Sequence, residues 1–176
     1  MTKEIRYKLT FRLFERADVE NKTKWMRNPA VRSNLGWQIR QGTNLKDQLK
    51  WFEKYQRNKN DRRFIIEADG KPIGIVGLTE GDPVDKNAEL YVVIGENGYR
   101  GQGIGRAACK FIIDYGFDKL KLHKILLVAN GYNLKAIGLY KTLGFVEEGR
   151  LRDQILKDGK YYEEVYLGLI NPNDQY

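Results

Sequence analysis

The sequence predicts a single α/β or α+β domain built around a mixed β-sheet. Runs of β-branched and aromatic residues alternate with segments of helical period, and no linker divides them. In particular, residues 88–94 (AELYVVI) read as a buried strand, and the glycine-rich run 100–105 (RGQGIG) leads from it into a segment with one apolar helical face. At 176 residues the chain is long enough for one sizeable core.

The first part of the chain predicts a strand, two helices and a β-hairpin. Asn28-Pro29 ends the first helix, because the residue before a proline disfavours helical geometry. Asn44 can cap the second helix, whose Leu45, Leu49 and Phe52 share one face. The predicted elements are a strand over Leu9–Phe14, a helix over Ala17–Arg27, a loop or short broken helix over residues 31–42, a helix from Asn44 onward, and hairpin strands over Arg63–Ala68 and Pro72–Leu78.

The second part adds central strands, two helices and closing strands. The apolar run Lys124–Ala129 (KILLVA) is typical of a strand that is buried on both faces. Gly144 occupies the C′ position after a helix, where glycine is favoured. The predicted elements are a polar loop over residues 81–87, the strand over 88–94, a helix after residue 105, a strand over Lys124–Ala129, a helix over Asn133–Leu143, and strands over Val146–Gly149, Gln154–Leu156 and Tyr161–Ile170.

Composition excludes several classes of protein. No apolar stretch approaches the roughly 18–20 residues of a membrane span. The first residues lack the apolar core of a signal peptide, so we expect a cytoplasmic chain. Cys109 is the single cysteine, which excludes an internal disulfide and a cysteine-based zinc cluster.

The net charge of +8 is concentrated in the first third of the chain. Residues 1–63 hold 17 Lys and Arg against 7 Asp and Glu, whereas residues 64–176 hold 14 against 16. This excess favours an anionic substrate or partner that meets the N-terminal part. An ordinary solvated basic surface is an equally good interpretation of the same charges.

The glycine-rich run 100–105 is the strongest functional motif. Backbone N–H groups in such a turn, together with the positive end of the following helix dipole, form a cradle for an anion. Neither the Walker pattern nor the G-x-G-x-x-G dinucleotide pattern fits, which leaves R-x-x-G-x-G. The run by itself is also compatible with a tight turn and a capped helix.

Three motifs in order resemble the GNAT superfamily of acyl-CoA-dependent N-acyltransferases. They are AELYVVIGENGYRGQGIGRAA, LLVANGYNLKAIGLYKTLGF and GFVEEGRLRDQILKDGKYYEEVYLGLI, and the likeness covers residues 5–170. It implies one domain over residues 1–176 with about seven strands, helices on both faces and splayed central strands at the CoA site. Within it, residues 88–145 hold the cofactor and residues 15–60 contribute to the acceptor site. The bacterial branches that it resembles acetylate spermidine, ribosomal proteins and amino sugars.

The resemblance also assigns the acetyl-CoA site. In this family the CoA pyrophosphate binds the R-x-x-G-x-G loop, and the pantetheine arm pairs with the open edge of the preceding strand. A β-bulge is the usual device that opens such strands, but none can be identified in the sequence. The cofactor-binding residues that follow are Val92, Val93, Ile94, Arg100, Gly101, Gln102, Gly103, Ile104, Gly105, Arg106, Asn130, Asn133, Ala136 and Tyr140.

Tyr140 and Glu89 are the candidate catalytic residues. By resemblance, Tyr140 in N-x-x-A-x-x-x-Y protonates the departing sulfur; without the motif it would be a core tyrosine. Glu89 is a carboxylate in an apolar strand, so burial would raise its pKa and suit it as the base, directly or through water. An outward-facing Glu89 is the equal alternative. The oxyanion would be held by the backbone N–H of Val93 or Ile94.

Several other residues belong to types that are often catalytic or ligand-binding, but we expect them to have structural roles here. His123 begins a strand, Cys109 packs in a helix, and Asn133 could serve as a helix cap alone. Trp25, Trp37, Trp51 and Phe52 lie where the family builds its acceptor site, yet core packing remains the default interpretation for each of them.

The acceptor is the least determined part of the prediction. The basic N-terminal part favours an anionic amino sugar over a polyamine or a ribosomal-protein terminus. A non-catalytic acyl-CoA sensor is the alternative of another class. We expect no metal, no membrane and no nucleic-acid partner, whereas a homodimer is compatible with the resemblance.

Overall fold

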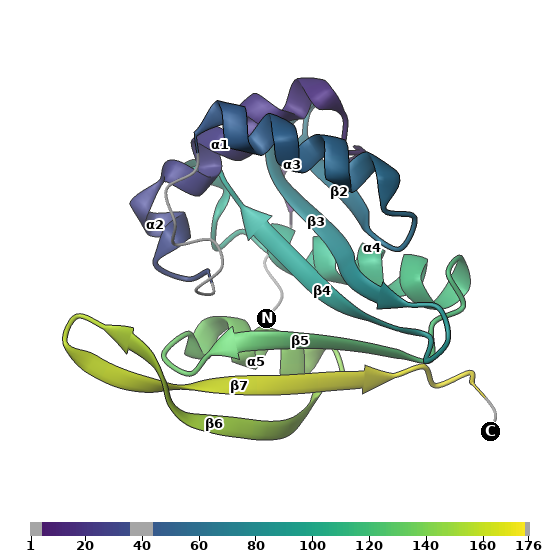
Figure 1. Cartoon of the computed structure of the whole chain (residues 1–176), viewed down its shortest axis with the longest axis vertical. Helices are drawn as coiled ribbons and strands as arrows, with labels where there is room; N and C mark the ends of the chain where they lie inside the picture. Colours follow the sequence, from purple (N-terminus) through teal and green to yellow (C-terminus); the bar gives the residue numbers. More distant parts are fainter. Residues whose placement is uncertain (1–4, 36–43, 175–176) are drawn as a thin grey trace.

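A seven-stranded sheet forms the centre of the computed structural model, which describes residues 5–35 and 44–174 (Figure 1). The strand order is β1-β2-β3-β4-β5-β7-β6, and only the β4–β5 pair is parallel. The strands are β1 (Leu9–Leu13), β2 (Arg62–Ala68), β3 (Lys71–Asp82), β4 (Asn87–Ile94), β5 (Lys124–Asn130), β6 (Val146–Lys157) and β7 (Lys160–Ile170). The predicted mixed sheet of about seven strands is therefore confirmed.

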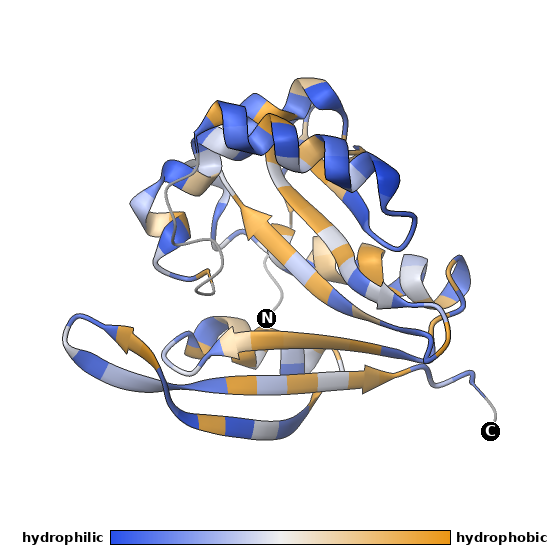
Figure 2. Cartoon of the chain, viewed as in Figure 1, coloured by the Kyte–Doolittle hydropathy of each residue, from blue (hydrophilic) through white to orange (hydrophobic). Residues whose placement is uncertain are grey.

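Helices cover both faces of this sheet, as predicted. The helices are η1 (Arg16–Asp18), α1 (Val19–Arg27), α2 (Pro29–Arg32), α3 (Leu45–Arg57), η3 (Asn97–Tyr99), α4 (Ile104–Asp118) and α5 (Leu134–Thr142). One apolar core lies between the sheet and α4 with α5, and a smaller one lies between the sheet and α1–α3. Figure 2 shows the matching pattern, with polar outer surfaces on α1 and α3 and apolar central strands.

β4 and β5 part after only three paired residues. Their parallel ladder joins Asn87, Ala88 and Glu89 to residues 124–126, and β4 continues to Ile94 without a partner on that side. β5 meanwhile stays paired with β7 along its whole length. Figure 1 shows the two strands close together at one end and diverging toward α2. The divergence opens the sheet at its centre.

The irregularity nearest to this opening lies on β3 and not on β4. β4 pairs with β3 in continuous register from Glu89 to Ile94. The register shifts between Thr79 and Asp82, where Glu80 takes a positive φ of 54°. A β-bulge therefore sits in β3 beside the point where β4 and β5 part.

The prediction that β5 is buried on both faces is wrong. Ile125, Leu127 and Ala129 face the core, whereas Leu126 and Val128 are only half-buried. The reason is that β5 and β7 lie beyond the α1–α3 layer, so one face of β5 is left open. The apolar run therefore belongs to a strand that is covered on one face only.

Smaller differences occur at element ends. The two strands predicted over residues 146–149 and 154–156 are one strand, β6, which keeps its course through two register shifts. The helix predicted over residues 17–27 begins with a 3₁₀ turn, and α2 occupies the start of the aperiodic segment. The caps were predicted correctly: Asn44 Oδ1 accepts from Asp47 N–H at 2.9 Å, and Gly144 takes a φ of 94°. Trp37 lies outside the described residues.

Candidate active site

A cavity of about 480 Å³ occupies the opening between β4 and β5. Its walls are the end of β4, the glycine-rich loop with the start of α4, the inner face of α5, and α2 with the residues just after it. Segments from both halves of the chain therefore meet around one space.

The glycine-rich loop forms one end of this cavity. Gly101 and Gly103 take φ values of 72° and 82°, which favour glycine. Gly103 is also the N-cap of α4, so no capping side chain covers the N–H groups of the first turn. At Gly105 an added Cβ would lie 3.9 Å from Leu139, which faces the same space. Gln102 is turned back, and its amide donates to Gly98 O at 2.5 Å. The loop therefore presents backbone amides to the cavity.

Basic side chains gather at the same end. Arg100 Nε donates to Ile94 O at 3.0 Å, and Arg100 Nη2 is buried without a hydrogen-bond acceptor among the described residues. Arg106, which donates to Thr142 Oγ1 at 2.5 Å, and Lys135 also line the cavity. A buried guanidinium N–H without an acceptor is unfavourable unless an anion fills the position. The donor set thus fits a phosphate-bearing ligand such as CoA.

The edge of β4 that faces the cavity is defined by its backbone alternation. The Val93 carbonyl faces Gly74 of β3. The backbone N–H and C=O groups of successive residues in a strand point to opposite edges of that strand. The groups of Val92 and Ile94 therefore point away from β3 and toward the opening. The Ile94 carbonyl is the one that Arg100 Nε binds. This leaves the Ile94 N–H and both polar groups of Val92 at the open edge.

Tyr140 lines the cavity from α5. Burial raises the pKa of its phenol strongly, and the neighbouring Cys109 contributes in the same direction. Its ring packs edge-on against Phe145 at 5.9 Å. The phenol therefore stays protonated at neutral pH and can donate a proton.

Glu89 lies where β4 and β5 part, although it is not among the residues that line the cavity. Its side chain is half-buried on the sheet face opposite Ala88 and Leu90, which point into the α4 core. Burial raises the pKa of Glu89, and Glu80 and Glu164 raise it further. This face is the one that α1–α3 leave open beside β5.

Three further residues that were predicted to bind the cofactor differ in how they are placed. Ile104 is in the core with its side chain 1% exposed, so only its backbone reaches the loop. Asn130 is buried and donates to Tyr132 Oη at 2.7 Å. Asn133 caps α5 by accepting from Ala136 N–H at 3.3 Å, and both residues line the cavity.

The two single-copy residues are not among those that line the cavity. His123 contacts Asp174 at 2.7 Å, and Cys109 is fully buried. Among residues 5–35 and 44–174, no group of three or more His, Cys, Asp or Glu side chains is placed to hold a metal ion.

Several lining residues were absent from the prediction. Lys135 and Leu139 share the face of α5 that holds Ala136 and Tyr140, and the helical period could have identified them. The residues contributed by α2 and the turn after it carry no such signal, because their segment is aperiodic. They are Ala30, Val31, Asn34 and Leu35.

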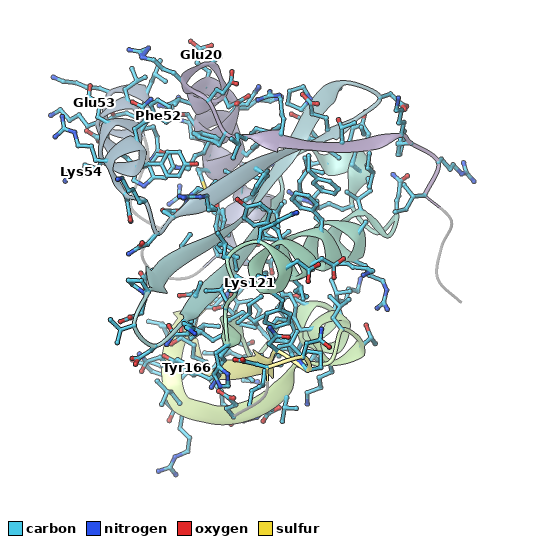
Figure 3. The ribbon with its side chains drawn as sticks, turned by 90° about the vertical axis from the view of Figure 1, so that its right-hand side faces the viewer. Glu20, Phe52, Glu53, Lys54, Lys121 and Tyr166 are labelled. Carbon is cyan, nitrogen blue, oxygen red and sulfur yellow. The ribbon has the colours of Figure 1, made fainter. Side chains whose placement is uncertain are left out.

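None of the basic residues within residues 5–35 and 44–63 lines the cavity. The lysines and the arginine of α3 are exposed on its outer surface, as Lys54 illustrates in Figure 3. The cavity residues contributed by residues 5–35 are uncharged. The charge therefore gives no support to the predicted preference for an anionic acceptor.

Comparisons with known proteins agree with this architecture. The profile of the Acetyltransferase (GNAT) domain matches residues 8–146. A spermidine N(1)-acetyltransferase of Escherichia coli is 37% identical over 116 residues, which cover 66% of this chain and 62% of that protein. The matched part thus spans less than two thirds of that relative.

Solved structures give the same result over more of the chain. Spermidine N-acetyltransferase of Vibrio cholerae in complex with CoA and spermine superposes with a TM-score of 0.85 at 30% identity, covering 92% of this chain and 95% of that chain. A dodecameric structure of the enzyme from the same organism gives a TM-score of 0.80 at 29% identity, covering 92% and 93%. Within the part of our chain that the structure describes, none of the helices has the length and apolar character needed to cross a bilayer.

Proposed function

Because this chain belongs to the GNAT acetyltransferase domain family, we propose that it transfers the acetyl group of acetyl-CoA directly to a primary amine of a polyamine-like small molecule. The observation that carries the proposal is the parting of β4 and β5 over a cavity whose one end is basic and rich in backbone amides. Residues 88–145 then form the donor site, and the segment within residues 15–60 that includes α2 forms part of the acceptor side.

The donor site uses the loop, the basic side chains and the open edge of β4. The amides of the α4 N-terminus and Arg100 Nη2 bind the pyrophosphate, and Arg106 and Lys135 add positive charge. The pantetheine arm pairs with Val92 and Ile94 as an added strand would. This arrangement directs the thioester toward the point where the strands part.

The acceptor side is acidic where it meets the open face of the sheet. Glu89, Glu164 and Tyr166 share that face, because their strand neighbours Leu90, Val165 and Leu167 point into the opposite core. Tyr166, labelled in Figure 3, donates to Glu164 Oε2 at 3.4 Å. A negative field of this kind attracts ammonium groups and repels anions. It favours the polyamine alternative, which also agrees with the named activity of the relatives, over an anionic amino sugar.

The chemistry follows from three groups. Glu89 accepts a proton from the acceptor ammonium, directly or through water, and its raised pKa suits this role. The free amine attacks the thioester carbonyl, and the Ile94 N–H is the better placed of the two candidate backbone donors for the oxyanion. A C–N bond forms, the C–S bond breaks, and Tyr140 gives its proton to the departing thiolate. The second proton, which the nitrogen loses on becoming an amide, returns to the Tyr140 phenolate through solvent, and Glu89 releases its proton to solvent.

The experiment is an acceptor panel with acetyl-CoA, in which released CoA thiol is measured for spermidine, spermine, a UDP-amino sugar and a ribosomal-protein N-terminal peptide. We expect turnover of the polyamines and a rate that rises with pH through the pKa of Glu89 as its carboxyl ionises. Glu89→Gln should abolish this rise of the rate with pH and lower kcat about 100-fold. Glu53→Gln, on the exposed side of α3, should behave as wild type. Preferential turnover of the sugar would refute the acceptor assignment. Tight CoA binding without any turnover would instead indicate a sensor.

A further inference from the structure

We infer that Tyr132 is a positioning residue of the acceptor site, because its phenol ties α2 to the far side of the opening. The expected effect on acceptor kinetics rests on the proposed function, whereas the structural role of Tyr132 does not. Tyr132 lies in the turn between β5 and α5, and its Oη donates to the Ser33 carbonyl at 2.6 Å. The two residues are 99 positions apart in sequence, so the bond joins separate layers of the molecule.

α2 is attached at both ends, once to each side of the opening. At its start, Asn28 caps the helix by accepting from Ala30 N–H at 3.0 Å, and its amide donates to Asn97 Oδ1 at 3.0 Å. Asn97 begins the η3 turn that leads from β4 into the glycine-rich loop. At its end, Ser33 is bound by Tyr132 from the β5 side. α2 therefore spans the two parted strands.

Tyr132 is itself held firmly. Asn130, only 5% exposed, donates to the same phenol oxygen at 2.7 Å. Tyr162 of β7 packs edge-on against the ring at 5.0 Å, and Lys157 Nζ lies 4.0 Å from the ring centroid. A phenol oxygen that accepts one hydrogen bond and donates another has a fixed direction. The Ser33 carbonyl is thus bound by an oriented donor.

The residues that this bond positions are those that line the cavity from α2. Ala30, Val31 and Leu35 are apolar, and Asn34 adds one amide. An apolar wall of fixed position suits the methylene segments of a linear aliphatic amine, while the acidic face binds its ammonium groups. The hydrogen bonds described above join Tyr132 to Ser33 and Asn130, neither of which is a predicted catalytic residue. We therefore expect its loss to change acceptor binding and not the chemical step.

The test is Tyr132→Phe, which removes Oη and keeps the ring. The substitution removes both hydrogen bonds of Oη, of which the one to the Ser33 carbonyl holds α2. Loss of that one bond corresponds to a change of about 3- to 10-fold, so we expect the KM for spermidine to rise by that factor. The KM for acetyl-CoA and kcat should stay within 2-fold. Amide hydrogens of residues 29–35 should exchange at least 3-fold faster, as measured by mass spectrometry. Tyr161→Phe on the exposed part of β7 is the matched control and should change none of these values.

The two arms of the test separate this inference from the proposed function. Equal effects on both KM values, or an unchanged KM for spermidine, would overturn it. If the wild-type protein turned over no acceptor, the proposed function would fail. In that case unchanged exchange of residues 29–35 in Tyr132→Phe would overturn the inference, and faster exchange would support it.

Discussion

Replacement of Lys22 by methionine tests how the N-terminal helices are packed on the sheet. Lys22 is 6% exposed between α1 and α3, where its ammonium donates to Gln48 Oε1 and lies 3.7 Å from the centroid of the Trp51 ring. The carboxylate that favours the charged form of Lys22 is that of Asp61, which is already paired, since Arg63 binds both of its oxygens at 3.0 and 3.1 Å. Burial, together with the smaller effect of the Arg63 charge, therefore lowers the pKa of Lys22 from an ordinary value of 10.5 to about 7.

The magnitude follows from this difference in pKa. Between pH 7 and pH 10.5 the unfolded chain binds more protons at Lys22 than the folded chain, so the free energy of unfolding rises with pH in this window. At about 1.36 kcal/mol per pKa unit, the full effect is about 5 kcal/mol, of which about 2 kcal/mol falls between pH 7 and pH 9. Methionine has a similar length and no charge, so Lys22→Met should be more stable than wild type at pH 7. Its advantage should shrink by about 2 kcal/mol at pH 9.

The assay is urea unfolding of both proteins at pH 7 and pH 9, followed by tryptophan fluorescence. The double difference in the free energy of unfolding isolates Lys22 from all other titrating groups. Lys54→Met provides the control, because Lys54 is exposed on the outer surface of α3 (Figure 3). A double difference for Lys22→Met that is no larger than that of the control would refute the assignment of a buried, desolvated ammonium.

Two further predictions concern the neighbourhood of the cavity. Gly95→Ala should lower the free energy of unfolding by about 1–3 kcal/mol, because an added Cβ would overlap the Trp25 indole; in the same denaturation assay, Gly98→Ala should cost far less, since nothing lies within 4 Å of that position. Tyr140→Phe should lower kcat about 100-fold while the KM for acetyl-CoA stays within 3-fold, and release of CoA thiol measures both values. An unchanged kcat would remove Tyr140 from the mechanism, and Tyr115→Phe on α4, outside the cavity, is the control.

Local sequence signals were sufficient where the chemistry is local. The loop at residues 100–105 could be identified because glycine alone takes positive φ readily and because a strand precedes the loop and a helix follows it. The face of α5 could be identified by its helical period, which places Asn133, Ala136 and Tyr140 on one side. Asn44 and Gly144 marked helix ends for the same reason.

Other features depend on layers that meet only in the folded chain. Whether Leu126 and Val128 are covered depends on where the α1–α3 layer ends. The residue pattern of β5 itself contains no information on the position of that layer. Whether the basic residues of α3 face the cavity depends on how that helix is turned. The contact between Tyr132 and Ser33 depends on the angle at which β4 and β5 part.

The order of elements and the glycine-rich loop could therefore be predicted from the sequence by itself, because each depends on the spacing of neighbouring residues, and the family followed from the resemblance of three motifs. The proposed acceptor side could be inferred only from the tertiary structure. Its acidic groups come from different strands, its apolar wall comes from α2, and their proximity results from the parting of the sheet. Net charge summed along a chain cannot reveal such a site, because electrostatic effects depend on where each charge lies in space.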